Sequence, residues 1–215
     1  MDSDLTYQQF SQGQLDLFPH HAAVDTPQVC LGDVEALTAL CASGARFGTV
    51  YADPPWPYGN TSTRAAAHRH YATLSLAELA RLPVRQLAMP SAHLYLWVTN
   101  SFIEEGLQLM RAWGFRYVSK RTWCKTQIGL GNYFRNATED VLLGVRGQCP
   151  FRDKSQSTWF LSGRGQHSRK PDLVRQCIER ASPGPYLELF GREAVDGWTV
   201  WGNQITPTLF AQAGD

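Results

Sequence analysis

The run Gly48-Thr49-Val50-Tyr51-Ala52, followed by Asp53-Pro54-Pro55-Trp56, decides the fold of this chain. Its first five residues are mostly β-branched, aromatic or small, which is typical of a buried parallel strand. The two prolines cannot extend that strand, and they hold the backbone in a stiff turn. Because an open α/β sheet binds its ligands at the carboxyl ends of its strands, this turn is predicted to lie at the functional site.

The turn presents three groups in a fixed relation: the Asp53 carboxylate, the Pro54 carbonyl and the Trp56 ring. Two acceptors and a flat ring together suit an aromatic amine, which has two N–H donors and a π face. The sequence therefore predicts a site that binds an amino-substituted ring.

Composition narrows the class of protein. A chain of 215 residues with 43% hydrophobic and 18% charged residues predicts one globular domain with a substantial core. The net charge of +1 means that any contact with nucleic acid must come from local basic patches. No apolar run is long enough to span a membrane, and the amino terminus does not resemble a signal peptide.

Five cysteines without a CxxC pair predict reduced thiols and a cytoplasmic protein. The histidines also lack ligand spacing, so we expect no metal site. Residues 1–26 are polar and glutamine-rich and predict a flexible tail. The folded domain is expected at 27–207, with a short tail at 208–215.

Periodicity and breakers predict alternating strands and helices within this domain. Ser75 and Glu78 have capping-box spacing at the start of one helix. The predicted strands are 28–31, 48–52, 93–98, 115–125, 139–145, 186–190 and 198–201, and the predicted helices are 35–41, 74–87, 102–113 and 172–181.

Two basic loops, 57–70 and 146–171, are expected to border the site, although the first could be a solvated surface loop. Arg64 and Arg69 in the first loop are candidate nucleic-acid contacts. Lys125, at the end of a strand, is either a phosphate contact or an ordinary solvated lysine. Tyr133-Phe134-Arg135 could offer aromatic rings and a cation to a nucleic acid.

Three further positions have two interpretations each. Asp33 could cap the helix that follows it or contact a ligand. Thr99-Asn100-Ser101 could face the crevice, but helix capping is favoured. Glu188 is an acid in a strand that is predicted to be buried, so its charge must be compensated. Either an ion pair with Arg192 or a contact with a ligand could compensate it.

Asp53-Pro54-Pro55-Trp56 resembles the catalytic motif of the MT-A70 family of adenine-N6 methyltransferases. Further pieces match in order and cover roughly residues 28 to 205. These are Leu-Trp-Val at 96–98, Trp-x-Lys at 123–125, Ser-x-Lys-Pro at 168–171, Leu-Phe-Gly-Arg at 189–192 and Trp-Gly-Asn-Gln at 201–204.

The resemblance implies a Rossmann-like methyltransferase fold in permuted order, with the strand before Asp53 preceding the strand that carries Glu188. It implies a mixed, mostly parallel sheet with helices on both faces. It also implies S-adenosylmethionine as cofactor and the tetrapeptide Asp53 to Trp56 as the catalytic residues, with Tyr71 beside the target base. The implied cofactor contacts are Asp33, Val34, Asp53, Lys170, Glu188, Arg192, Asn203 and Gln204.

The predicted reaction is methylation of the N6 amine of adenine in nucleic acid, with DNA preferred over RNA. RNA is the first alternative, and a non-catalytic scaffold subunit is the second. Gln14-Leu15-Asp16-Leu17-Phe18 resembles the short peptide that binds the bacterial DNA sliding clamp. A chance match, or a segment that packs on the domain, is the alternative for these five residues.

Overall fold

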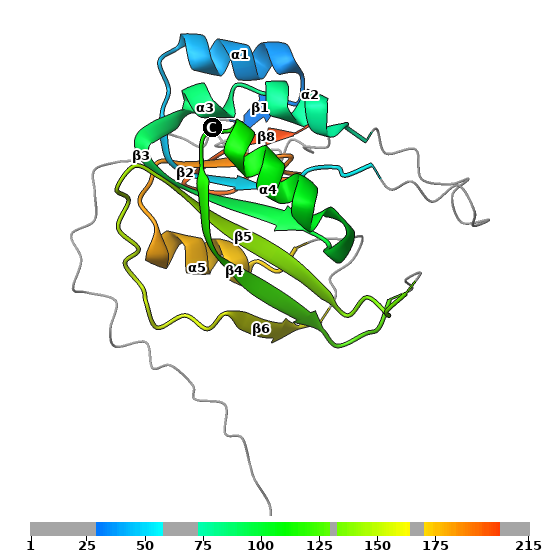
Figure 1. Cartoon of the computed structure of the whole chain (residues 1–215). Helices are drawn as coiled ribbons and strands as arrows, with labels where there is room; N and C mark the ends of the chain where they lie inside the picture. The colour runs from blue at the N-terminus through cyan, green and yellow to red at the C-terminus, as the bar shows by residue number, and fades with distance from the viewer. Residues whose placement is uncertain (1–28, 58–72, 130–132, 164–169, 203–215) are drawn as a thin grey trace, which may run out of the picture.

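The computed structural model describes residues 29–57, 73–129, 133–163 and 170–202, which form an eight-stranded sheet flanked by helices (Figure 1). The strands are β1 (Val29–Leu31), β2 (Phe47–Ala52), β3 (Ala88–Val98), β4 (Arg116–Lys125), β5 (Thr138–Arg146), β6 (Trp159–Ser162), β7 (Tyr186–Leu189) and β8 (Trp198–Gly202). The helices are α1 (Val34–Ala42), α2 (Leu76–Arg81), α3 (Val84–Leu87), the 3-10 turn η3 (Asn100–Phe102), α4 (Ile103–Ala112) and α5 (Leu173–Ala181).

The strand order is β1-β8-β7-β2-β3-β5-β4-β6. Only β5 pairs with its two neighbours in the antiparallel sense among these strands. The prediction of a mixed, mostly parallel α/β sheet is therefore confirmed. The strand that ends before Asp53 also precedes the strand that carries Glu188 in the chain, and it lies directly beside it.

The order of the strands locates the crevice. The chain passes from β2 to its neighbour β3 on one side, and from β7 to its neighbour β8 on the other side. In such sheets, ligands bind where the connections that follow two neighbouring parallel strands run in opposite directions. The binding crevice lies at the carboxyl ends of those strands. Asp53 follows β2 at this switch point, and its amide donates a 3.5 Å hydrogen bond to the carbonyl of Leu189, the last residue of β7.

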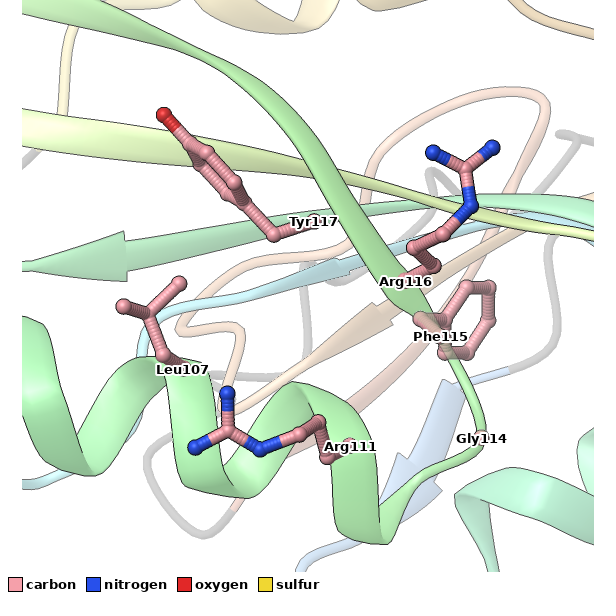
Figure 2. Close-up of a pocket in the computed structure, with 6 residues that line it drawn as sticks. All are labelled: Leu107, Arg111, Gly114, Phe115, Arg116 and Tyr117. Atoms are coloured by element: carbon pink, nitrogen blue, oxygen red, sulfur yellow. The ribbon is translucent and has the colours of Figure 1, made fainter.

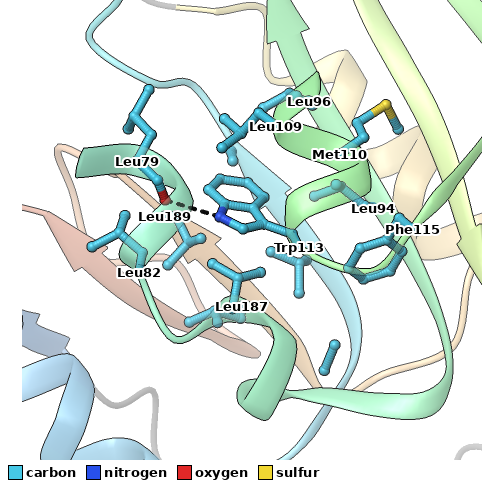
Figure 3. Close-up of a cluster of buried hydrophobic side chains, with 14 of the residues drawn as sticks. Leu79, Leu82, Leu94, Leu96, Leu109, Met110, Trp113, Phe115, Leu187 and Leu189 are labelled. Atoms are coloured by element: carbon cyan, nitrogen blue, oxygen red, sulfur yellow. Dashed lines mark hydrogen bonds between the residues drawn. The ribbon is translucent and has the colours of Figure 1, made fainter. Parts of the chain in front are cut away.

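Alternating side chains divide the core between the two faces of the sheet. One face, here called the dry face, is apolar and is covered by α1, α2 and α4. Its centre is Trp113, which is fully buried and donates a 2.9 Å hydrogen bond from Nε1 to the Leu79 carbonyl (Figure 3). The strand residues of the dry face include Val50, Ala52, Leu94, Leu96, Leu187 and Leu189.

The opposite face, here called the aromatic face, packs against α5, which Figure 1 shows on the other side of the sheet. Val174 and Ile178 of α5 contact this cluster. The strand residues of the aromatic face include Tyr51, Tyr95, Trp97, Trp123, Trp198 and Val200. Successive residues of β2 and β3 thus enter different cores, as expected for strands with both faces covered.

Three local predictions differ from the structure. The expected helix over 74–87 is two short helices, because Pro83 cannot donate a helical hydrogen bond; the Ser75 capping box itself is confirmed. The segment 146–171, expected to be a loop, contains the edge strand β6, which pairs with β4. Thr99 makes no side-chain cap at η3. In the part of the chain that the structure describes, no helix is long and apolar enough to cross a membrane.

Candidate active site

The turn after β2 is held by its own backbone. The Pro54 carbonyl accepts a hydrogen bond of 2.9 Å from the Trp56 amide, and the Pro55 carbonyl accepts one of 3.1 Å from the Leu74 amide. A carbonyl oxygen has two lone pairs, so Pro54 can accept one more donor. The Asp53 side chain is 31% exposed at the crevice. The turn therefore offers a carboxylate and a carbonyl in a fixed arrangement, as the sequence predicts.

The Trp56 side chain lies in the core and is only 4% exposed. Its ring stacks on Phe102 at a centroid distance of 5.4 Å, and its Nε1 donates a 3.0 Å hydrogen bond to the Trp97 carbonyl. This placement corrects the expectation of an open ring that holds the target base. Trp56 instead ties the turn to β3, so it positions Asp53.

Lys170 comes from the segment before α5 and reaches the turn across 117 residues of sequence. Its Nζ lies 2.7 Å from Asp53 Oδ2 and 3.5 Å from an oxygen of Glu139. Burial alone would lower the pKa of Lys170, but the two carboxylates reverse this effect and raise the pKa above its ordinary value. Lys170 is therefore a charged partner of the candidate catalytic acid.

Lys125 is neither a solvated lysine nor free to contact a phosphate in this arrangement. Its side chain is 9% exposed, its Nζ pairs with Glu139, and it lies 4.9 Å from the centroid of the Trp123 ring. The phosphate interpretation of Lys125 is therefore not supported by its surroundings. The expectation of a solvated lysine is wrong because β5 brings Glu139 opposite the end of β4, and the phosphate contact stays a prediction.

Glu188 has a partner that sequence reasoning missed. Arg175 of α5 holds its carboxylate through two hydrogen bonds, Nε to Oε2 at 2.8 Å and Nη2 to Oε1 at 2.9 Å. The structural alternative that paired Glu188 with Arg192 is thus wrong, and Arg192 is exposed. Burial raises the pKa of Glu188, although the Arg175 guanidinium opposes this shift. The signal for this pair was present in the sequence as an arginine among the apolar residues of α5.

Asp33 caps α1, because its Oδ1 accepts a 2.7 Å hydrogen bond from the Ala36 amide. Its backbone carbonyl accepts a 2.9 Å hydrogen bond from Trp201 Nε1. Val34 beside it is 53% exposed. The capping interpretation of Asp33 is therefore present in the structure.

Thr99 gives an independent indication that the crevice receives a polar ligand. Its Oγ1 is buried and has no hydrogen-bond partner among the described residues. A buried hydroxyl without a partner is costly, so such a group is usually completed by water or a ligand. Thr99 directly follows β3 at the same edge of the sheet as Asp53. Sequence reasoning favoured a cap for this residue and so overlooked it.

Several predicted site residues lie outside the described residues. These are Arg64, Arg69, Tyr71, Asn203, Gln204 and the segment Gln14 to Phe18. Within the described ranges, no group of three or more histidine, cysteine, aspartate or glutamate side chains could hold a metal ion.

A hollow lies between α4 and the start of β4, lined by Leu107, Arg111 and Gly114 to Tyr117 (Figure 2). It sits at the end of β4 opposite Lys125 and contains no carboxylate. The hollow is therefore separate from the crevice at Asp53.

Comparison with known proteins agrees with the geometry. The MT-A70 family model matches residues 47–204. The chain is 31% identical over 182 residues to the type II methyltransferase M.MunI of Mycoplasma sp, covering 74% of this chain and 78% of that protein.

Two human proteins are also similar. The N(6)-adenine-specific methyltransferase METTL4 is 29% identical over 198 residues, covering 81% of this chain and 41% of METTL4. The N(6)-adenosine-methyltransferase catalytic subunit METTL3 is 32% identical over 178 residues, covering 74% of this chain and 28% of METTL3. The family match spans β2 to β8, and Asp53 stands at the switch point that the strand order defines. The chain belongs to the MT-A70 family of adenine-N6 methyltransferases.

Proposed function

We propose that this chain transfers a methyl group from S-adenosylmethionine to the N6 amine of adenine in DNA, with Asp53 as the catalytic residue. The observation that carries the proposal is the position of Asp53. Its partly exposed carboxylate follows the central strand β2 at the topological switch point, and Lys170 fixes one of its oxygens at 2.7 Å.

The donor set fits the cofactor. S-adenosylmethionine, when bound, supplies a methyl group on a positively charged sulfur and is therefore already activated for transfer. The Lys170 ammonium group suits the carboxylate of its amino-acid end, and the unpartnered Thr99 hydroxyl supports a polar ligand at this edge. Asp33, Val34, Glu188 and Arg192, together with Asn203 and Gln204, are the other proposed cofactor contacts.

Asp53 and the Pro54 carbonyl act on the target amine. The lone pair of an adenine amine is delocalised into the ring, so the amine is a poor nucleophile. Two acceptors that bind its two hydrogens favour a pyramidal nitrogen with its lone pair available for attack. The nitrogen becomes acidic once it gains a fourth bond, so Asp53 needs to accept a proton only at that stage. Positioning and electrostatics carry the catalysis.

The target base must leave a duplex stack, or be found unpaired, before it can reach this crevice. Tyr71, Arg64 and Arg69 are the proposed contacts to the nucleic acid. The similarity to a type II methyltransferase supports DNA. RNA is the rival substrate, because METTL3 is an adenosine methyltransferase by name.

We also propose that Gln14 to Phe18 docks on a DNA sliding clamp, with the apolar side chains as anchors. Docking raises the local concentration of DNA without a large basic surface, which agrees with the net charge of +1. A pull-down with purified clamp tests this. Alanine at Leu17 and Phe18 should abolish binding and leave activity on short oligonucleotides intact, and a wild-type chain that fails to bind at high micromolar concentration would refute the docking proposal.

The test of catalysis is Asp53→Asn, which keeps the shape of the side chain and removes its charge. Labelled cofactor is incubated with single-stranded DNA, duplex DNA and RNA, and the products are digested to nucleosides. We expect N6-methyladenine from DNA with wild type and at least about a hundred-fold loss of rate with Asp53→Asn. The matched control is Asp196→Asn, an exposed acid before β8 at the other end of the sheet. A variant at Asp53 that keeps half the wild-type rate would refute the mechanism.

The cofactor contacts have a separate test. Lys170→Ala and Asn203→Ala should weaken S-adenosylmethionine binding in calorimetry more than they weaken DNA binding. Normal cofactor affinity in both variants would place the cofactor elsewhere.

A further inference from the structure

Four charged side chains, beginning with the candidate catalytic acid, form a row of alternating sign. They come from the end of β2, the segment before α5, the start of β5 and the end of β4, which all meet at one edge of the sheet. In order from the crevice they are Asp53, Lys170, Glu139 and Lys125, and their side chains are 31%, 17%, 17% and 9% exposed.

Glu139 is the bridge in this row. Its Oε1 pairs with Lys125, and its Oε2 lies 3.5 Å from Lys170 Nζ, so each oxygen serves a different lysine. The Lys170 ammonium group also lies 5.1 Å from the centroid of the Trp97 ring. Two acids and an aromatic ring thus surround one ammonium group, and this environment determines where Lys170 stands relative to Asp53.

We propose that Glu139 is a positioning residue for methyl transfer: it shares the Lys170 ammonium group with Asp53, so that Asp53 keeps acceptor capacity for the target amine. This inference rests on the proposed function of Asp53 and Lys170. Glu139 itself acts through Lys170, because its carboxylate oxygens are directed at the two lysines.

The physical reason is competition for one cation. A lysine ammonium group has three donors and is a compact charge that turns toward the nearest carboxylate. With Glu139 ionised, Lys170 is attracted from two sides, and the Asp53 carboxylate is only one of its acceptors. Without that second acid, Asp53 would be the remaining protein carboxylate of this pair on the ammonium group, which would then take more of the acceptor capacity that the amine needs.

Glu139→Gln is a sharp test because an amide has a single oxygen. Each carboxylate oxygen of Glu139 faces a different lysine, so the NH₂ group that replaces one oxygen cannot accept from the lysine there and repels it, while the shape of the side chain is kept. The adjacent acid Asp140 provides a matched control. It also pairs with a lysine, Lys120 at 2.7 Å, but it belongs to the opposite face of the strand. Asp140→Asn therefore makes the same chemical change one residue away, outside the row.

The first readout is the Lys170 ammonium resonance in ¹⁵N-labelled ligand-free protein, identified by its loss in Lys170→Met. We expect Glu139→Gln to shift and broaden this resonance, and Asp140→Asn to leave it unchanged. A Lys170 resonance that is identical in wild type and Glu139→Gln overturns the proposal. This readout needs no activity, so it tests the effect of Glu139 on Lys170 separately from the proposed methyl transfer.

The second readout is kinetic. We expect Glu139→Gln to lower kcat about ten-fold, the effect of losing one charge-assisted contact, with the KM for DNA within about two-fold. Asp140→Asn should keep kcat within about two-fold. Glu139→Asp restores the charge and should recover part of kcat, and it also serves if the glutamine variant does not fold. A Glu139→Gln enzyme with unchanged kcat, or with its loss confined to KM, overturns the proposal.

Discussion

The two faces of the sheet differ in the number of buried side chains, which is larger on the dry face, and in their chemistry. The dry face is centred on Trp113 and leucines, and its polar contacts include single hydrogen bonds from tryptophan nitrogens to carbonyls, such as Trp113 to Leu79 and Trp56 to Trp97. The aromatic face borders the row of charges at Lys170 and the pair at Glu188.

The difference follows from the residue types on each face. Tyrosine and tryptophan carry a polar atom at the end of a large apolar ring, so they can pack tightly and still satisfy a charged neighbour. Trp97 Nε1, for example, donates a 2.7 Å hydrogen bond to the Tyr51 hydroxyl. Leucine has no such atom. The comparison teaches that buried charge lies on the face whose side chains can accommodate it. Substitutions on the two faces should therefore change the free energy of unfolding for different reasons.

The largest effect is expected on the dry face. Trp113→Ala removes a fully buried ring and the hydrogen bond to the Leu79 carbonyl. We expect a loss of about 3–5 kcal/mol in the free energy of unfolding, because the cavity cannot fully collapse. Urea unfolding measures this loss, and the folded fraction should methylate DNA at the wild-type rate. A loss below about 1 kcal/mol would show that the dry face is not the main source of stability.

On the aromatic face, Arg175→Met should cost about 3 kcal/mol, because it leaves the Glu188 carboxylate buried without its cation. The second change, Glu188→Gln, should recover part of this loss in the double variant, since no buried charge then remains. Urea unfolding of the two single variants and the double variant gives the coupling energy. Additive losses would mean that the pair is not coupled in solution.

A change at Trp56 tests whether the candidate catalytic turn depends on packing against the dry face. Trp56→Phe keeps the ring that stacks on Phe102 but leaves the buried Trp97 carbonyl without its donor. We expect a loss of about 1–3 kcal/mol in unfolding free energy and a KM for DNA within about two-fold of wild type. The matched control is Trp113→Phe, which breaks the equivalent bond far from the turn. A large rise in KM confined to Trp56→Phe would assign its ring to the substrate.

The smallest effect concerns pH. His93 is fully buried, with Nδ1 2.8 Å from Ser182 Oγ, and burial lowers its pKa below the ordinary value. His93 therefore binds a proton less readily in the folded protein than in the unfolded chain, where the pKa of a histidine is about 6.5. The contribution of His93 to the free energy of unfolding is complete above that pH. It is lost as the pH falls toward the lower pKa of His93 in the folded protein, by at most about 1.4 kcal/mol per pH unit. Urea unfolding at several pH values should show this slope, and His93→Gln should flatten it.

Local sequence determined much of the fold. The β-branched and aromatic run before Asp53 is a central strand, and Ser75 and Glu78 form the predicted capping box, because both depend on residues that are neighbours in the chain. The helix expected over 74–87 is divided into two at Pro83, although the proline was visible in the sequence. The edge strand β6 was missed because it is short and depends on pairing with β4. The central strand and the position of the turn at Asp53 thus follow from patterns within a few residues, whereas the permuted order of the strands was an expectation from the family resemblance.

The partners of the charged side chains were decided by the tertiary structure alone. A sequence shows that Glu188 and Lys170 need compensation, but not that Arg175 compensates the first, or that Asp53 and Glu139 share the second. Those choices depend on how α5 packs against β7 and on β5 running antiparallel beside β4, which brings Glu139 opposite the end of that strand. Attraction between charges acts through space and has no period along the chain. The order of residues therefore determines which charges are buried, and the packing of the elements determines which of them form pairs.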